Sequence, residues 1–409
     1  MRASPLRKPG APVLRGTDLR GLHQLGVDAV VGVTDLVEAM HHTIASGAGI
    51  VGRAPAGRTR GITGMVYGSV RGTTRVVGRG VDALIAAWPA RRVPDGPSRA
   101  RDATIAALNG VWGDHLASTG NPLAIGMSLR MGGLPVPTTH EGWAARGTAP
   151  SRRLLILVHG LCMSDLQWTH RGHDHGQALA CELGFTPLYL HYNSGRHVWQ
   201  TGREFAALLD DLIARWPVQV DELVFVGHSM GGLVARSACY EAARAGHAWP
   251  ATLAKMVFLG TPHHGAPLER GGRHIDRALG LSPYVAPFAR LGRSRSAGIT
   301  DLRFGNVREC DRPGRDRHAQ HHDDRPATPL PAGVDSYLLA ATTAERASGL
   351  QGAVIGDGLV PVDSALGRHR NPAMRLCVPS SHQRLVTGCS HLGLLDNAEV
   401  LQQLRAWLQ

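Results

Sequence analysis

Residues 224–234, VFVGHSMGGLV, place a serine between glycines directly after an apolar run. The segment GHSMG (227–231) fits the pattern G-x-S-x-G. The apolar run before it and the helical pattern GLVARSACYEAARA after it predict a strand, a sharp turn and a helix. Flanking glycines let the serine adopt a strained conformation that projects its hydroxyl, and the turn aims backbone N–H groups at a developing oxyanion. We therefore predict that Ser229 is a nucleophile.

Apolar runs alternate with helical stretches on both sides of this turn, from Arg153 onward. The runs LLILVHG, FTPLYLHY, ELVFVGHS and KMVFLGTP are separated by helical patterns near residues 168–183, 200–215 and 230–245. Continuous apolar strands with helices between them indicate a parallel sheet that is covered on both faces. The predicted fold class is α/β, with a mostly parallel, twisted sheet flanked by helices. A site in such a sheet lies at the carboxyl ends of the strands.

A serine hydroxyl needs a general base, and the base needs an acid that orients it. Downstream, VIGDGLVPVDSALG offers Asp357, placed before a glycine in an expected strand-end loop. A carboxylate at a tight turn can reach sideways to an imidazole, so Asp357 is the preferred acid. Asp363, six residues later, and Asp335, before the run SYLLAA, are weaker alternatives.

The preferred base is His391, in the segment VTGCSHLGLLDN just before the expected final helix. It follows an expected last strand at MRLCVPS (374–380), and a loop after that strand is where the base has to lie. His382 is the nearest rival, but it sits closer to the end of that strand. Because the chain has 22 histidines, position rather than residue type decides the choice.

The oxyanion is expected to bind two backbone N–H groups. One belongs to Met230, the residue after the nucleophile, and the other to the loop after the first parallel strand. That strand ends in His159-Gly160-Leu161, where Gly160 allows the chain to turn and Leu161 supplies the donor.

Together these features resemble the α/β-hydrolase superfamily, in particular its lipase and esterase branches. The resemblance covers about residues 152–409 and rests on VHGL (158–161), GHSMGG (227–232), GTPHHGAP (260–267), GDGLVP (356–361) and SHLGLL (390–395). It implies Ser229 as nucleophile, Asp357 as acid and His391 as base, with the oxyanion donors named above.

The resemblance also implies which residues line the site without reacting. The GTPHHG segment is similar to one in lipases and lipid-remodelling deacylases, where it lines the site. His263 and His264 are therefore expected beside the site but not in catalytic roles. His159, Gly160 and His228 are expected to line it as well.

The N-terminal part, about residues 1–120, is predicted to be a helical extension. Apolar residues at three- and four-residue steps predict amphipathic helices over 24–44 and 61–88, followed by a third helix. In the second helix Gly64, Gly68 and Gly72 are four apart, which favours close approach of another helix. A basic stripe, Arg71, Arg75 and Arg79, has the same spacing. Two interpretations stay open: a hairpin packed on the rest of the protein, or a surface that docks on an anionic membrane or lipid body.

Residues 121–151 are interpreted as two short strands around Gly132-Gly133 and a linker that leads into the hydrolase domain, 152–409. An insertion over about 267–333 interrupts the α/β rhythm and is a candidate lid. Its polar part holds His318, His321, His322, Asp323 and Asp324. A mobile polar loop is preferred there over a metal site, because no spacing brings these side chains to one face.

Composition limits the alternatives. Of the net charge of +12, residues 1–150 contribute +8, with 17 Lys/Arg and 9 Asp/Glu, which suits either a solvated surface or an anionic lipid partner. No nucleic-acid partner, metal or cofactor is expected. Six scattered cysteines, expected to be mostly reduced and packed, and the lack of 18 consecutive apolar residues are typical of a cytoplasmic protein, peripherally membrane-associated if the helices dock.

The predicted function is hydrolysis of carboxylic esters through an acyl-enzyme, most suitably of lipid-like acyl esters. An alternative substrate is a hydroxyalkanoate polyester on an intracellular granule. A hypothesis from another class is a non-catalytic hydrolase-like module that binds lipid surfaces or helical partners through the N-terminal hairpin.

Overall fold

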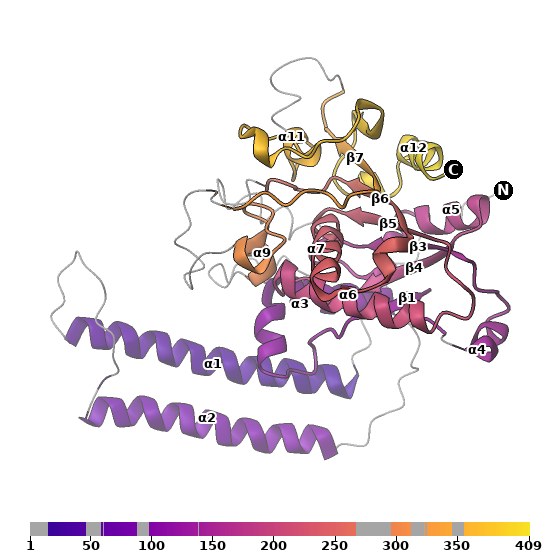
Figure 1. Ribbon diagram of the computed structural model, residues 1–409. Helices are drawn as coiled ribbons and strands as arrows, with labels where there is room; N and C mark the ends of the chain where they lie inside the picture. Colours follow the sequence, from indigo (N-terminus) through magenta and orange to yellow (C-terminus); the bar gives the residue numbers. More distant parts are fainter. Residues whose placement is uncertain are drawn as a thin grey trace, which may run out of the picture. The chain divides into compact units, whose positions relative to one another are not determined.

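The computed structural model describes residues 15–45, 59, 61–87, 98–137, 139–266, 296–311, 323, 325–345 and 356–409. The chain divides into two compact units, which are described separately below (Figure 1). The first comprises Met1–Gly96 and Ser118–Ala124, and the second comprises Pro97–Ala117 and Ile125–Gln409. Almost all of α3 (Arg99–Ser118) therefore lies in the unit that contains the sheet.

The second unit is built on an eight-stranded sheet of order β2-β1-β4-β3-β5-β6-β7-β8. Only β1 runs antiparallel to its neighbours β2 and β4, and the strands from β4 to β8 are parallel. The strands are β1 (Ser128–Met131), β2 (Leu134–Pro135), β3 (Arg153–Val158), β4 (Thr186–His191), β5 (Glu222–His228), β6 (Leu253–Leu259), β7 (Asp335–Ala341) and β8 (Gln383–Val386). The predicted α/β class with a mostly parallel sheet is confirmed.

Helices cover both faces of this sheet because apolar side chains of the central strands point alternately to either side. On one face Leu154 and Ile156 of β3 pack in a cluster with Phe205 and Leu233. These two residues belong to α6 (Val198–Ala214) and α7 (Met230–Ala245), which pack against each other.

On the other face Leu155 and Leu157 of β3 pack in a cluster with Leu179 and Leu404. Those residues come from α5 (His175–Leu183) and α12 (Ala398–Leu408). Shorter helices, α4 (His140–Ala145), α9 (Ala297–Asp301) and α11 (Val362–Ala365), lie in the connections.

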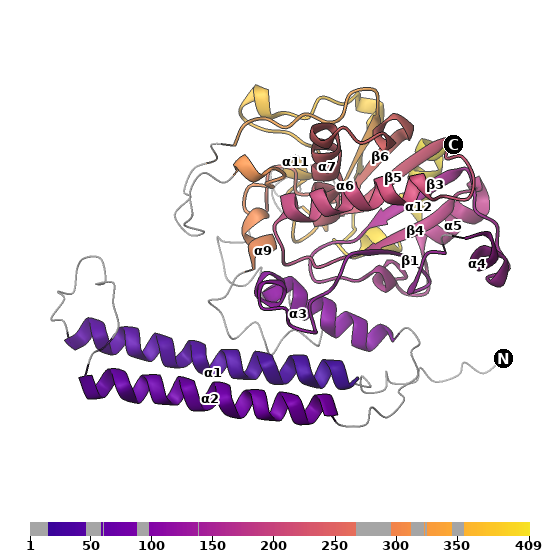
Figure 2. The same ribbon diagram turned by 60° about the horizontal axis from the view of Figure 1, so that its bottom comes forward.

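The first unit is a hairpin of α1 (Gly16–Ala45) and α2 (Gly61–Ala87), which lie side by side in Figures 1 and 2. The seam between them is polar. Arg71 Nη1 contacts Glu38 Oε2 at 2.5 Å and Asp35 Oδ1 at 2.9 Å, and Arg20 binds both carboxylate oxygens of Asp82. These ion pairs connect the two helices, so the acidic side chains that form them lie between the helices.

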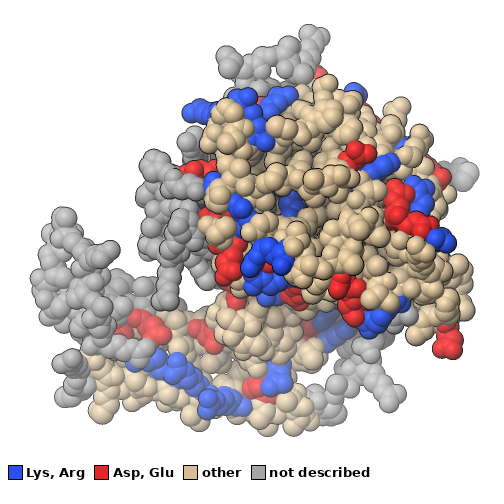
Figure 3. All heavy atoms as spheres, viewed as in Figure 1, with Lys and Arg blue, Asp and Glu red and all other residues tan. Residues whose placement is uncertain are grey.

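The outer face of α2 is apolar and exposed. Six large apolar side chains of this helix are between 43% and 69% exposed: Met65, Val66, Val70, Val76, Val77 and Leu84. Figure 3 shows basic side chains gathered along the hairpin beside this uncharged surface. We call these six side chains together with the exposed Arg75 and Arg79 the α2 outer face.

Two details of the predicted stripes in this helix are wrong. Arg71 does not belong to an exposed basic stripe, because it is buried in its ion pairs with α1. The helices approach each other closely at Gly78, where a Cβ would lie 2.7 Å from Val27 Cγ2. At Gly68 and Gly72, by contrast, a Cβ would meet no atom within 4 Å.

Three further expectations concern the second unit. The last strand is β8, residues 383–386, and not MRLCVPS, since that segment turns back to the loop after α11 through a hydrogen bond from Leu376 N to Gly367 O.

All six cysteines are free thiols, but Cys181, Cys310 and Cys377 are exposed rather than packed. Most of the lid-like insertion, including His318, His321, His322 and Asp324, lies outside the described residues.

Candidate active site

The carboxyl ends of the parallel strands bring the predicted site residues to one edge of the sheet. Ser229 directly follows β5, and the loop 159–161 follows the adjacent strand β3. Asp357 lies in the connection after β7, and His391 lies in the loop after β8. This edge is the part of a parallel α/β sheet where sites form.

The turn at Ser229 has the geometry of a tight strand-to-helix elbow. Ser229 has φ 54° and ψ −127°, a region that costs a non-glycine residue about 1–3 kcal/mol. Its N–H donates to Leu259 O at 2.9 Å, which fixes the turn against β6. A Cβ at Gly231 would lie 2.1 Å from Val158 O, so only glycine fits there. The elbow leaves the Ser229 side chain partly exposed at the sheet edge.

Asp357 and His391 form a buried pair beside this turn. His391 Nδ1 lies 2.6 Å from Asp357 Oδ2, and His391 N donates to Asp357 O at 3.0 Å. The other carboxylate oxygen accepts from Leu359 N and Val360 N. Since an ionised carboxylate is only an acceptor, the imidazole proton lies on Nδ1, and Nε2 keeps a free lone pair.

Gly260, the first residue of the GTPHHG segment, makes room for this pair. It has φ 58°, and a Cβ there would lie 3.0 Å from Asp357 Oδ2 and 3.2 Å from His391 Nδ1. Sequence reasoning did not assign it a role at the site. The sequence signal was its position directly after β6, the strand next to the one that precedes Ser229.

The rival residues lie elsewhere. Asp335 begins β7, at the opposite edge of the sheet. His382 Nδ1 contacts Ser336 O at that same edge, and its ring packs on Tyr337. Asp363 is an exposed residue that pairs with Arg368. None of the three contacts His391 or Ser229 among the hydrogen bonds and ion pairs of the described residues.

His228 connects the nucleophile strand to the His391 loop. Its Nε2 donates to His391 O at 3.0 Å, and the two rings lie 4.7 Å apart. Burial, followed by the proximity of His391, lowers the pKa of His228 well below its usual value. A neutral His228 therefore holds the main chain of His391 without adding charge beside the His391 imidazole.

The loop after β3 lies against the elbow. A Cβ at Gly160 would be only 3.0 Å from Ser229 Cβ, so the glycine allows this close approach. None of the described residues accepts a hydrogen bond from the amides of Leu161 or Met230. These two N–H groups are available to a ligand at the serine.

His159, in this loop, packs against Tyr192. The rings are stacked 4.2 Å apart, and the Tyr192 hydroxyl donates to His159 O at 2.6 Å. Burial lowers the pKa of His159 to about 3, so this ring is neutral. Tyr192, which directly follows β4, was not identified from the sequence, because an aromatic residue after a buried strand has no distinctive pattern.

His263 and His264 lie in the loop after β6, at the same edge of the sheet. His263 Nδ1 accepts from Arg236 Nη1 at 3.2 Å, and His264 Nε2 contacts Gly367 O at 3.2 Å. Arg236 belongs to α7, the helix that begins directly after Ser229. The GTPHHG histidines thus anchor their loop to this helix and to the connection after α11.

Residues 150–280 match the sequence profile of the PGAP1-like alpha/beta domain. The matched segment includes strands β3 to β6 of the parallel sheet. No curated protein matches the sequence. Among the described residues, no group of three His, Cys, Asp or Glu side chains is placed to hold a metal ion, and every helix is too short or too polar to cross a membrane.

Solved structures similar to the hydrolase domain include enzymes from three organisms. A mature lipase of Bacillus licheniformis is 16% identical over 64% of this chain and 94% of its own, with a TM-score of 0.40. An esterase of Pyrococcus furiosus is 15% identical over 63% and 81%, with a TM-score of 0.36. The phospholipase PlaB of Legionella pneumophila is 17% identical over 52% and 45%, with a TM-score of 0.34.

Proposed function

We propose that the protein is a serine hydrolase that cleaves carboxylic esters through an acyl-enzyme, with lipid-like acyl esters as its substrates. The observation that carries the proposal is the buried Asp357–His391 pair at the strand edge that also holds Ser229 in a strained turn. A strained nucleophile, an oriented imidazole and two free amides are the parts that acyl transfer requires.

In the proposed reaction His391 Nε2 takes the Ser229 proton as Oγ attacks the ester carbonyl. The N–H groups of Leu161 and Met230 bind the oxyanion. When the tetrahedral intermediate collapses, the ester C–O bond breaks and His391 gives its proton to the leaving alkoxide. Water then attacks the acyl group by the same route, which releases the acid and restores Ser229.

Replacement of the nucleophile tests this proposal. Ser229→Ala is expected to lower kcat on p-nitrophenyl esters by at least about 10⁴-fold, while circular dichroism stays unchanged. A fluorophosphonate probe is expected to label the wild type at Ser229 and not the variant. Wild-type turnover by Ser229→Ala, or an unlabelled wild type, would contradict the proposal and favour a non-catalytic binding module.

We also propose that the α2 outer face docks on an anionic lipid surface. Its six apolar side chains are exposed, and Arg75 and Arg79 form no ion pair with any described residue. Apolar side chains on one face of a helix with arginines beside them suit the boundary between lipid headgroups and acyl chains. The polar seam supports this reading, because it holds the hairpin together without using that face.

Vesicle flotation of the full chain tests the docking. The double variant Val76→Asp/Leu84→Asp is expected to lose binding to vesicles that contain phosphatidylglycerol. Leu134→Asp, at an apolar residue 45% exposed in β2, is the matched control and is expected to bind like the wild type. Arg75→Gln/Arg79→Gln is expected to weaken binding to anionic vesicles only. Unchanged binding of the Asp variant would exclude the α2 outer face.

A further inference from the structure

Arg236 is a buried guanidinium without a carboxylate partner among the residues that the structure describes. It lies on α7, and it is 6% exposed. Its Nη1 donates to His263 Nδ1 at 3.2 Å and its Nη2 donates to Thr328 O at 2.5 Å, but Nε is buried without a partner. Burial, reinforced by the nearby Arg325, lowers the pKa of Arg236 to about 10, which still leaves it charged at neutral pH.

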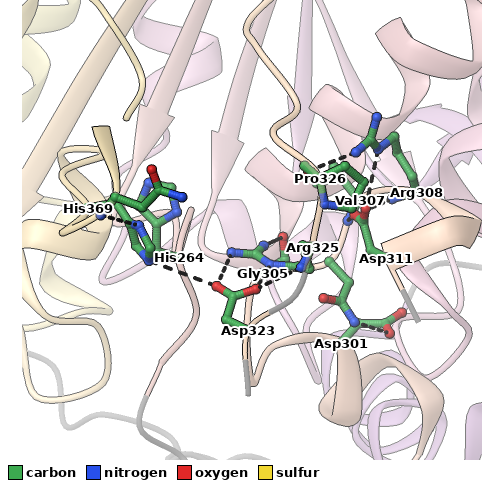
Figure 4. A network of polar contacts seen from close by, with 12 residues as sticks. His264, Asp301, Gly305, Val307, Arg308, Asp311, Asp323, Arg325, Pro326 and His369 are labelled. Carbon is green, nitrogen blue, oxygen red and sulfur yellow. Dashed lines mark hydrogen bonds and ion pairs between the residues drawn. The ribbon is translucent and has the colours of Figure 1, made fainter. Parts of the chain in front are cut away.

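The neighbouring arginines, in contrast, are each neutralised (Figure 4). Arg325 contacts Asp323 through Nε at 2.7 Å and Nη2 at 3.0 Å, and donates from Nη1 to Gly305 O. Arg308 Nε donates to Asp311 Oδ1 at 3.2 Å, while Asp311 Oδ2 accepts from the amides of Val307 and Arg308. Among the described residues of this cluster, two carboxylates are thus shared among three guanidinium groups, and one positive charge is left over. A buried charge without a counter-charge costs several kcal/mol.

A small cavity lies at this point. Arg236, His263, Asp311 and Arg325 line it together with His264 and residues around 305–307 and 326–328, and its volume is about 10 Å³. This is room for one small occupant, a water molecule or a single monatomic ion, and not for a polyatomic group such as phosphate. Arg236 and His263 are both more than nine-tenths buried.

His263 supplies a second hydrogen-bond donor. Burial, followed by the charge of Arg236, lowers the pKa of His263 well below its usual value, so the ring is neutral. Because Nδ1 accepts from Arg236, the single ring proton is on Nε2, and that nitrogen is buried without a partner. Two N–H groups of cavity-lining residues, Arg236 Nε and His263 Nε2, therefore lack acceptors.

We propose that this cavity binds a single monatomic anion, chloride, held by Arg236 and His263. The ion would neutralise the excess positive charge and accept hydrogen bonds from both unpartnered N–H groups. It would connect α7, whose first residue follows Ser229, to the GTPHHG loop. The site does not depend on the proposed ester hydrolysis, because its consequence is a change in stability.

Thermal unfolding of the full chain tests the site. In sodium chloride the Tm is expected to rise saturably by about 3 °C above its value in sodium gluconate of equal ionic strength. Arg236→Met is expected to abolish this difference. Arg244→Met is the matched control, because Arg244 is on the same helix with an exposed side chain, and this variant is expected to keep the difference. Equal Tm values of the wild type in the two salts, or a chloride effect that persists in Arg236→Met, would overturn the proposal.

A second measurement needs no variant. Crystals of the wild type grown with sodium bromide are expected to show an anomalous difference peak between Arg236 and His263. Bromide is slightly larger than chloride but has the same charge and shape. A cavity that is empty or holds only water, without anomalous signal, would overturn the proposal even if the variant failed to fold.

Discussion

Ser229 holds a backbone conformation that glycine adopts at lower cost, with φ 54°. Ser229→Gly and Ser229→Ala both lack the hydroxyl, so a difference between their stabilities reports backbone strain and not the loss of the nucleophile. The free energy of unfolding of Ser229→Gly is expected to exceed that of Ser229→Ala by about 1 kcal/mol, with a correspondingly higher Tm, because alanine keeps the Cβ that makes this region unfavourable. Differential scanning calorimetry of the pair measures it. Equal Tm values would show that the turn stores no strain.

Asp357 is expected to orient His391 through its Oδ2. Asp357→Asn keeps the shape of the side chain but removes the charge that fixes the proton on Nδ1. We expect kcat on p-nitrophenyl esters to fall by about 10⁴-fold with little change in KM. Asp363→Asn is the matched control, since Asp363 is exposed and pairs only with Arg368 on the surface. A larger loss in the control than in Asp357→Asn would move the acid role to Asp363.

For single residues, the sequence supports the prediction of a site role only where that role depends on a local sequence pattern. Ser229, Asp357 and His391 each lie in a loop next to a strand or helix signal, and the structure brings the last two within 2.6 Å. Residues that act through distant contacts leave no such pattern. Tyr192 and Arg236 are examples, because each is defined by a partner far away in the chain.

Helices α1 and α2 show what periodicity can and cannot predict about an element. The apolar spacing predicts both helices, and the structure has them at Gly16–Ala45 and Gly61–Ala87. It does not predict which face is buried, since the seam is made by ion pairs such as Arg71–Glu38, with apolar side chains of α2 on the outside. How two helices pair depends on the side chains of both. The apolar stripe of one helix therefore does not determine which of its faces is buried.

The glycines of α2 provide a matched test of this packing. Gly72→Ala places a methyl group in open space and is expected to raise the free energy of unfolding by up to about 1 kcal/mol, because alanine favours helix. At Gly78 the same methyl group would lie 2.7 Å from Val27 Cγ2, so Gly78→Ala is expected to gain nothing or to destabilise. Urea unfolding followed at 222 nm measures both. Equal gains would argue against close packing at Gly78.

The error at the last strand has a related cause. MRLCVPS contains a short apolar run, Leu376 to Val378, as a buried strand does, while QRLV is short and weakly apolar. The structure nevertheless pairs QRLV with β7 from Leu338–Gln383 to Ala341–Val386. An edge strand is selected by its register against a neighbour, and its own pattern is a weak guide.

For the molecule as a whole, buried neutral histidines predict sensitivity to acid. Burial lowers the pKa of His159 to about 3 and of His175 to about 4, and it lowers those of His228 and His263 well below the usual value. An unfolded chain binds protons at these sites below about pH 6.5, whereas the folded protein does not. Their contribution to stability is therefore complete above pH 7 and is lost as the pH falls toward 4.

Each such histidine removes up to about 1.4 kcal/mol per pH unit in that window. The Tm of the full chain is expected to fall steeply between pH 6.5 and 4.5, where exposed carboxylates still remain ionised. Carboxylates such as Asp165, whose pKa is lowered in the folded state, contribute to the loss only below about pH 5. A Tm that is constant from pH 7 to 4.5 would contradict the assignment of neutral, buried rings.

The left-handed conformation of Ser229 also bears on how this chain can change over generations. A single codon change to glycine would remove the hydroxyl and relieve the strain in one step. Under the proposed role of Ser229, this substitution would raise stability while removing turnover, so that only selection for turnover would oppose it. Descendants that keep the hydrolase fold but have glycine at this position would be expected wherever the reaction is no longer needed.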